Sequence, residues 1–227
     1  MSSSITKPIK ITVSDAVRVS GLIQSPPHAR ACYVLAHGAG AGMNHPFMAA
    51  VAQELAKRQI ATLRYQFPHM ERRAKRPDPP PIAQATVRAA AAAALNLLPK
   101  LPLIAGGKSF GGRMTSQAQA NASLAGVRGL AFLGFPLHPA GRPSQDRAKH
   151  LFDIQIPMLF LQGARDTLAS LDELRPVCMR IGKLASLKVF AGADHSFHVP
   201  ARSGRSDTQV LGEVMDALSD WLDSVIR

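Results

Sequence analysis

The stretch L-I-A-G-G-K-S-F-G-G-R-M, residues 103–114, decides the fold. A short apolar run leads into Ser109, which lies between Gly107 and Gly111 in a G-x-S-x-G pattern, and a run typical of a helix follows. A serine on a sharp strand-to-helix turn takes strained backbone angles, and the residues two before and two after it must lack a Cβ so that strand and helix can pass closely. The pattern also arises in Gly/Ser loops without chemistry, but the strand before it and the helix after it supply the context it requires. The sequence therefore predicts that Ser109 is a raised nucleophile.

Length and composition predict one domain, residues 1–227, with a single core. The chain is 46% hydrophobic and 19% charged, as globular proteins are. Residues 1–10 are polar and lack the apolar segment of a secretory signal, so we expect a cytoplasmic location. The longest apolar run, residues 89–98, is too short to span a bilayer and predicts a buried helix, so no membrane partner is expected.

Cysteine and charge content bound the partners. The two cysteines, Cys32 and Cys178, lie in apolar stretches and predict buried thiols rather than a metal site or a disulfide. A net charge of +12 suggests an anionic substrate or nucleic acid, but the basic residues are spread along the chain. The one compact cluster, within residues 72–76, has no interleaved aromatic residues, so a solvated loop is favoured and nucleic acid is not expected. The sequence indicates no oligomeric state.

Apolar periodicity predicts alternating strands and helices. The expected strands are 9–13, 16–24, 31–36, 60–65, 103–105, 129–135, 158–162 and 186–190, and the expected helices are 46–57, 82–98, 112–122, 145–152, 171–181 and 207–226. The first two strands alternate apolar and polar residues, as an antiparallel hairpin does, whereas residues 31–36 form a nearly continuous apolar run that fits a strand covered on both faces. The fold class is therefore α/β, a mostly parallel sheet with helices on both faces and an antiparallel N-terminal hairpin. Residues 66–81, rich in proline and charge, predict an irregular surface excursion.

Polar residues gather just after several of these strands, where ligands bind in such sheets. The sequence H-G-A-G-A-G follows one strand at residues 37–42, and Ser109, Asp166 and His195 follow three others. A serine hydroxyl needs an imidazole to accept its proton and a carboxylate to orient that imidazole. These residue types in the chain order Ser, Asp, His predict a catalytic triad.

With these motifs in view, the chain resembles the α/β-hydrolase superfamily, in a small dienelactone-hydrolase-like form. The likeness covers about residues 30–200 and rests on G-K-S-F-G (107–111), H-G-A-G-A-G (37–42), G-A-R-D (163–166) and A-D-H-S-F (193–197). R-Y-Q-F-P (64–68), R-P-D-P-P-P (76–81) and F-P-L-H-P (135–139) are similar to a compact group that includes bacterial hydrolases of unassigned substrate and the third subunit of a eukaryotic non-specific-lethal chromatin complex.

The resemblance implies roles for individual residues. Ser109 is the nucleophile, Asp166 the acid and His195 the base, with oxyanion donors at the Phe110 N–H and at an N–H near Ala39. Dienelactone hydrolases proper use a cysteine nucleophile, so their substrate is not carried over to this chain. Only some twenty residues, 135–157, stand where larger hydrolases insert a helical lid, so we expect an open site with no lid domain.

Several site residues have other interpretations. Asp166 could cap the following helix, although Asp172 is better placed for that role, and His198 rivals His195. Asp194 is expected to brace the histidine loop, because adjacent side chains diverge. Lys108 and Arg113 flank the nucleophile and are either surface residues or contacts for an anionic substrate.

The sequence thus favours a serine hydrolase, or carboxylesterase-like enzyme, that cleaves a small ester, thioester or lactone through an acyl-enzyme. No cofactor or metal is expected for this chemistry. The alternative is a non-catalytic interaction module on the same fold, since a fold does not fix a function.

Overall fold

The computed structural model describes residues 5–226. Its centre is an eight-stranded sheet in the order β1-β2-β4-β3-β5-β6-β7-β8. The strands are β1 Ile5–Ser14, β2 Val17–Ser25, β3 Ala31–Ala36, β4 Ile60–Tyr65, β5 Leu103–Lys108, β6 Val127–Leu133, β7 Met158–Gly163 and β8 Ala185–Phe190. β2 pairs antiparallel with both β1 and β4, and every pairing from β4 to β8 is parallel. The predicted fold class is confirmed.

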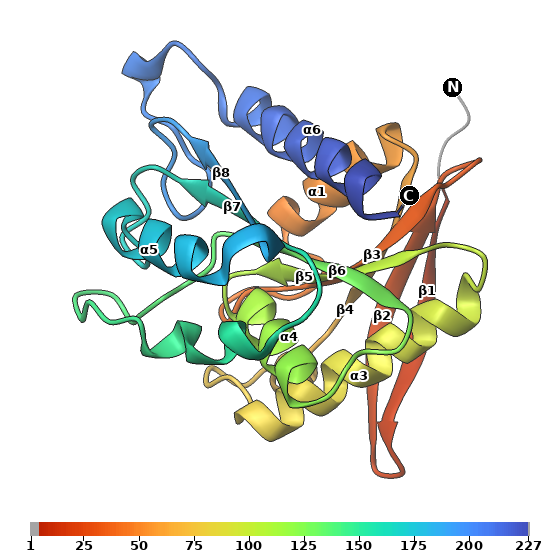
Figure 1. Ribbon diagram of the computed structural model, residues 1–227. Coiled ribbons are helices and arrows are strands. Elements are labelled where there is room, and N and C mark those ends of the chain that lie inside the picture. Colours follow the sequence, from red (N-terminus) through yellow and green to blue (C-terminus); the bar gives the residue numbers. More distant parts are fainter. Residues whose placement is uncertain (1–4, 227) are drawn as a thin grey trace.

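Helices cover both faces of the sheet (Figure 1). α1 Pro46–Lys57 and α6 Asp207–Ile226 pack on one face, where their apolar residues form one core cluster. α3 Pro80–Leu97, α4 Phe110–Asn121, α5 Leu171–Ile181 and the 3₁₀ helix η1 Asp146–Asp153 contribute to the cluster on the other face. β3 and β4 are buried along their whole length, and β3 accordingly carries a continuous apolar run, whereas β4 also buries Thr62 and Arg64.

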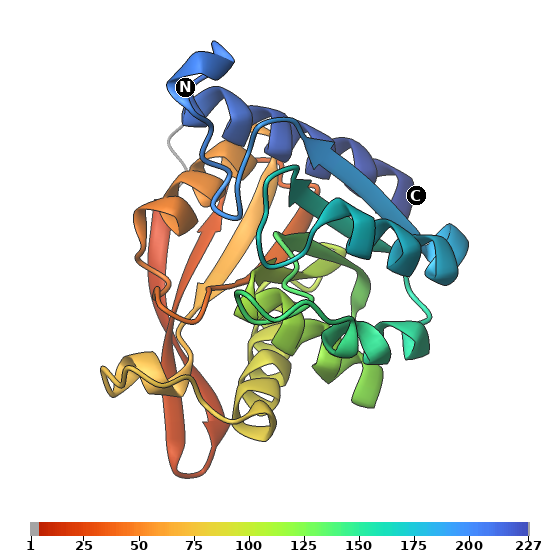
Figure 2. The same ribbon diagram turned by 90° about the vertical axis from the view of Figure 1, so that its left-hand side faces the viewer.

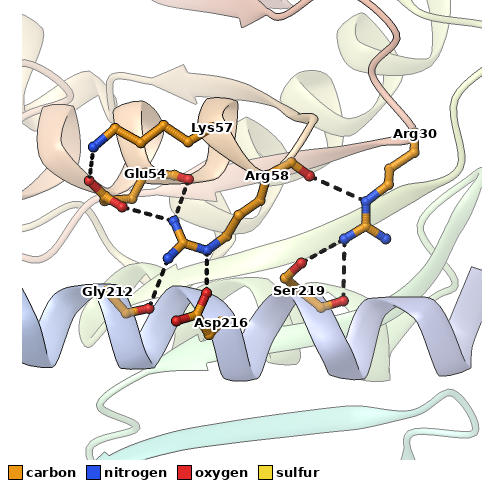
Figure 3. Close-up of polar contacts among 7 residues, drawn as sticks. All are labelled: Arg30, Glu54, Lys57, Arg58, Gly212, Asp216 and Ser219. Carbon is orange, nitrogen blue, oxygen red and sulfur yellow. Dashed lines mark hydrogen bonds and ion pairs between the residues drawn. The ribbon is translucent and has the colours of Figure 1, made fainter.

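Arginines fasten α6 to the end of α1 (Figure 3). Arg58 Nε donates to Asp216 Oδ1 at 2.8 Å, and its NH2 group donates to the Gly212 carbonyl at 3.2 Å. One turn further along α6, Arg30 donates to Ser219 Oγ at 2.6 Å. With α6 fixed in this way, the loop between β8 and α6, which carries His195, is held at both ends.

The segment between β4 and α3 is more ordered than the proline and charge content predicted. It holds the short helix α2 Pro68–Glu71, which lies beside β2 (Figure 2). His69 and Asp78 are buried inside the segment and bond to each other, so the prediction of an irregular surface excursion was wrong for this part. Buried polar groups that satisfy one another order a loop that composition alone marks as solvated.

Side-chain caps mark the starts of α1 and α5. The cap of α1 is His45, since His45 Nδ1 accepts the Phe47 N–H at 3.2 Å. The cap of α5 is Ser170, which forms a capping box with Glu173, whereas Asp172 lies within the first turn. In both helices the start lies where local bonds satisfy the first free N–H groups.

Further helix bounds complete the fold: η2 spans Gly182–Leu184 and η3 spans Ala201–Ser203. Cys32 and Cys178 are buried free thiols, as predicted.

Between β6 and β7 the chain forms η1 and loops, and within residues 5–226 no lid covers the strand ends. Among those residues, none of the helices has the length and apolar character needed to cross a membrane.

Candidate active site

Ser109 occupies a strained turn between β5 and α4. Its φ of 50° and ψ of −113° lie in a sparsely populated region, which costs about 1–3 kcal/mol in a residue with a Cβ. A Cβ at Gly107 would lie 2.1 Å from the Ala36 carbonyl oxygen, and one at Gly111 would lie 2.5 Å from the His37 carbonyl oxygen. Both glycines are therefore required for the close passage of the elbow and β3, as the pattern predicted.

A buried carboxylate orients the predicted imidazole. His195 Nδ1–H donates to Asp166 Oδ2 at 2.6 Å, and the Asp166 side chain is fully buried while that of His195 is 21% exposed. Gln162 Nε2 donates to the same oxygen at 2.6 Å, and the Leu168 N–H donates to Asp166 Oδ1 at 2.8 Å. Three donors fix the carboxylate in one orientation, so Asp166 does more than cap a turn.

The loops that carry Asp166 and His195 are joined by backbone bonds. The Ala164 N–H donates to the Phe190 carbonyl at 3.0 Å, and the Arg165 N–H donates to the Ala193 carbonyl at 2.8 Å. These bonds extend the pairing of β7 and β8 beyond the sheet, so the two loops hold one relative position.

Asp194 and His198 form hydrogen bonds that hold this loop in place. Asp194 Oδ1 accepts the N–H groups of Ser196 and His198 at 2.7 and 3.0 Å, which confirms the expected brace. His198 is 62% exposed and bonds to Asp207 at the start of α6. That bond raises the pKa of His198 above its ordinary value.

Ser109 and His195 line one cavity of about 340 Å³. Ser109 also borders a second, larger cavity of about 890 Å³, so it stands where the two meet. Within residues 5–226 the Ser109 hydroxyl makes no hydrogen bond. The structure thus brings Ser109, Asp166 and His195 to the carboxyl edge of the sheet, where a substrate can reach the serine from two sides.

The backbone around the serine can receive negative charge. Phe110 is the first residue of α4, and the first N–H groups of a helix have no acceptor within the helix. The helix dipole adds positive potential at the same end. Ala39 lines the larger cavity and Gly38 and Gly40 line the smaller one, so the glycine-rich loop faces Ser109 from the other side.

Two buried histidines hold this loop: His37, which opens the H-G-A-G-A-G motif, and His69, to which no sequence motif pointed. His37 Nε2 accepts the Phe67 N–H at 3.0 Å, and its Nδ1–H donates to the Gly38 carbonyl at 2.8 Å. Burial lowers the pKa of His37 to about 4, so the ring stays neutral. The His69 ring lies between Asp78 and the glycine-rich loop, with Nδ1 2.9 Å from Asp78 Oδ2 and Nε2 3.3 Å from the Ala39 carbonyl oxygen.

Lys108 supports the histidine loop from β5. Its ammonium donates to the His195 carbonyl and lies 5.6 Å from the centre of the Phe197 ring. Burial lowers the pKa of Lys108 to about 8, against the attraction of nearby carboxylates. Gly134, at φ 72°, gives these groups room, because a Cβ there would lie 2.9 Å from Lys108 Nζ and 3.2 Å from His195 Cε1. The L-G-F-P run at residues 133–136 is the only sequence signal of this position.

A second Ser–His pair lies on the inner face of α4. Ser116 Oγ contacts His150 Nε2 at 2.7 Å and donates to the Arg113 carbonyl at 2.9 Å. Ser116 has no exposed surface, and burial together with the charge of Arg113 lowers the pKa of His150 to about 4. This pair ties α4 to η1.

The larger cavity has a basic wall. Its lining combines prolines with charged residues from the segment after β4, from α4 and from η1: Arg72, Arg76, Asp78, Arg113 and Arg147. The segment after β4 therefore forms a rim beside Ser109. Arg147 was not singled out from the sequence, because nothing local distinguishes it from the other arginines.

The strand order, the elbow and the carboxylate-bound imidazole define the α/β-hydrolase class. The chain belongs to this family, since the family model described as "Alpha/beta hydrolase domain" matches residues 29–223.

Solved structures with the same fold include hydrolases. The structure is similar to a dienelactone hydrolase from Anabaena variabilis, with a TM-score of 0.80, 19% identity and 99% of each chain covered. It is similar to the esterase domain of a Rhodothermus marinus protein, with a TM-score of 0.74, 14% identity, and 98% of this chain and 100% of that one covered. A Xanthomonas campestris protein described as an α/β serine hydrolase without a lid gives a TM-score of 0.73 at 19% identity over 95% and 94% of the two chains. Family and fold together support hydrolase activity.

Proposed function

We propose that this protein is a serine hydrolase that cleaves a small carboxylic ester, thioester or lactone through an acyl-enzyme intermediate. The observation that carries the proposal is the hydrogen bond from His195 to the buried Asp166, beside a strained Ser109 that opens to two cavities. Backbone strain at a solvent-accessible serine is typical of a nucleophile held for attack.

In the proposed mechanism, Ser109 Oγ attacks the carbonyl carbon of the substrate while His195 Nε2 takes its proton. Asp166 holds the other nitrogen of the ring and stabilises the imidazolium that forms. The C–O or C–S bond to the leaving group then breaks as His195 returns the proton to that group. Water, activated by the same histidine, attacks the acyl carbon and releases Ser109.

The oxyanion donors in this proposal are the N–H groups of Phe110 and Ala39. Phe110 N–H stands at the positive end of α4, which stabilises the negative charge of the tetrahedral intermediate. His69, anchored to Asp78, holds the Ala39 carbonyl and so orients the peptide groups of that loop. Lys108, which bonds to the His195 carbonyl, acts as a positioning residue.

Labelling with a fluorophosphonate probe tests the proposal. The wild-type chain is expected to take one label, located at Ser109 by peptide mass spectrometry, while Ser109→Ala takes none. Ser116→Ala is the matched control and should label as the wild type does, because Ser116 has no exposed surface. A wild-type chain that takes no label and hydrolyses no short-chain aryl ester would favour the non-catalytic interaction module instead.

A further inference from the structure

The larger cavity beside Ser109 carries more positive charge than the protein neutralises. Four arginines line it, and Asp78 is its one carboxylate within residues 5–226. Both carboxylate oxygens of Asp78 already have partners. Its Oδ1 accepts from Arg72 at 2.7 Å, and its Oδ2 accepts the backbone N–H of His69 and contacts the Nδ1 atom of the same residue. In the described part of the chain, no ion pair involves the remaining three: Arg76, Arg113 and Arg147.

Arg113 and Arg147 both line this cavity and are close enough for their charges to repel each other. The Arg113 Nε atom is buried and has no hydrogen-bond partner within residues 5–226. Burial, with repulsion from Arg147, lowers the pKa of Arg113 to about 10, and burial lowers that of Arg147. A half-buried pair of like charges is unfavourable on its own, and a bound carboxylate would satisfy both charge and donors.

The pair is placed relative to the nucleophile by local structure. Arg113 lies one helical turn after the serine, since its N–H donates to the Ser109 carbonyl at 3.0 Å. Arg147 belongs to η1, which the bond between His150 and Ser116 fastens to α4. Both guanidinium groups are therefore carried by elements that hold a fixed position beside Ser109.

We propose that Arg113 and Arg147 together bind a carboxylate group of the substrate, so that the preferred substrate is an anionic ester rather than a neutral one. This inference rests on the hydrolase function proposed above and adds its substrate class. Carboxylate fits because the planar guanidinium donates two parallel hydrogen bonds to it. Lys108 is not part of this subsite, because its ammonium bonds to the His195 carbonyl.

Direct binding by Arg113 and Arg147 differs from attraction of anionic esters over a distance by the basic segment after β4. The positions of the residues in that segment distinguish the two effects. Arg72 is paired with Asp78, and neither Arg73 nor Lys75 lines the cavity. Neutralising Arg73 and Lys75 should therefore leave the preference for an anionic ester intact, whereas a change at Arg113 or Arg147 should remove it.

Two matched ester pairs test the subsite with the full chain. One pair is 4-acetoxybenzoate and its methyl ester, with the charge on the leaving group. The other is 4-nitrophenyl hydrogen adipate and its methyl ester, with the charge on the acyl group. In at least one pair, Arg113→Gln and Arg147→Gln should each lower kcat/KM for the anionic ester by about 10- to 100-fold, with less than about threefold change for the neutral ester. Arg142→Gln is the control, an exposed arginine of the same connection that does not line the cavity, and should change neither.

Binding without turnover separates failure of the subsite from failure of the hydrolase function. Calorimetric titration of Ser109→Ala with 4-acetoxybenzoate should show binding that Arg113→Gln weakens at least about tenfold, with inorganic phosphate as a competing anion. Hydrolysis of the neutral esters through Ser109, with equal losses for both members of each pair, would overturn the carboxylate subsite and leave the hydrolase. Retained anion binding in a chain that neither labels nor hydrolyses would overturn the hydrolase and leave the subsite. If inorganic phosphate binds more tightly than 4-acetoxybenzoate, the carboxylate subsite is overturned and the subsite is assigned to a phosphate group of the substrate.

Discussion

Ser109 and Ser116 belong to the elbow and to helix α4, and each lies near a histidine, His195 and His150 respectively. The two serine–histidine pairs differ in hydrogen bonding, in exposure and in backbone conformation. Ser116 and His150 are in hydrogen-bond contact at 2.7 Å, whereas the Ser109 hydroxyl makes no hydrogen bond within residues 5–226. Yet Ser116 has ordinary helical surroundings and no exposed surface, while Ser109 has positive φ and borders two cavities. Under the proposed mechanism, a short Ser–His distance is therefore a poor guide to the nucleophile.

The partners of the two histidines explain the difference. His195 Nδ1 donates to the buried carboxylate of Asp166, which holds the ring in one orientation. His150 instead faces the charge of Arg113, which together with burial lowers its pKa to about 4. An imidazole so disposed to stay neutral is a weak base, so His150 acts as a hydrogen-bond partner between α4 and η1.

The largest expected effect separates the two pairs by activity. Ser109→Ala and His195→Ala should each reduce kcat for a short-chain aryl ester by at least about 10⁴-fold, and the double variant should lose little more, because nucleophile and base act as a unit. Ser116→Ala and His198→Ala should stay within about threefold of wild type. Steady-state kinetics against a no-enzyme blank measure this, and clear residual turnover in Ser109→Ala would place the chemistry elsewhere.

Removal of the carboxylate charge should have the next largest effect. Asp166→Asn keeps the size of the side chain but no longer stabilises the imidazolium, so kcat should fall by about 10³- to 10⁴-fold with a smaller change in KM. The carboxyl group near the second pair offers a comparison, since Asp153→Asn should leave kcat unchanged. An Asp166→Asn variant with near wild-type kcat would mean that the bond to His195 is structural only.

Lys108, which supports the first histidine, should give the protein a pH-dependent stability. Its folded-state pKa of about 8 lies below the ordinary 10.5, so between these values the unfolded chain binds more protons than the native one. The free energy of unfolding should therefore rise with pH from about 8 to about 10.5, by about 3 kcal/mol from this group. Urea denaturation at both pH values measures the rise, and Lys108→Met should lack it. An equal rise in wild type and variant would assign it to other groups.

The smallest effects should be on stability, and of opposite sign for the two serines. Ser116→Ala leaves His150 without its partner and should lower the free energy of unfolding by about 1 kcal/mol. Ser109→Gly relieves the positive φ and should raise it by about 1 kcal/mol while activity is lost. Thermal denaturation measures both, with Ser123→Ala, an exposed serine after α4, as a reference. Destabilisation by Ser109→Gly would contradict the strain at the elbow.

The features that the sequence predicted follow from local patterns along the chain. The roles that it did not predict depend on contacts between residues far apart in the chain. Residues 31–36 and 60–65 were predicted as strands with the observed bounds, because buried parallel strands are rich in apolar residues between turns. The residues after strands were brought together as expected, because parallel strands end at one edge. His69, Gly134 and Arg147 were not predicted as site residues, since each owes its role to a partner more than eight residues away.

Asp78 has a consequence for attempts to redesign the segment after β4. That segment lines the larger cavity and is the natural place to graft a different loop for a different substrate. But Asp78 also anchors His69, which in turn holds the Ala39 carbonyl beside the nucleophile. In the proposed mechanism this loop therefore cannot be replaced without affecting catalysis. A graft that omits the Asp78 carboxylate would change the rate of the chemical step as well as the choice of substrate. Libraries built on this segment should keep Asp78 and His69 constant.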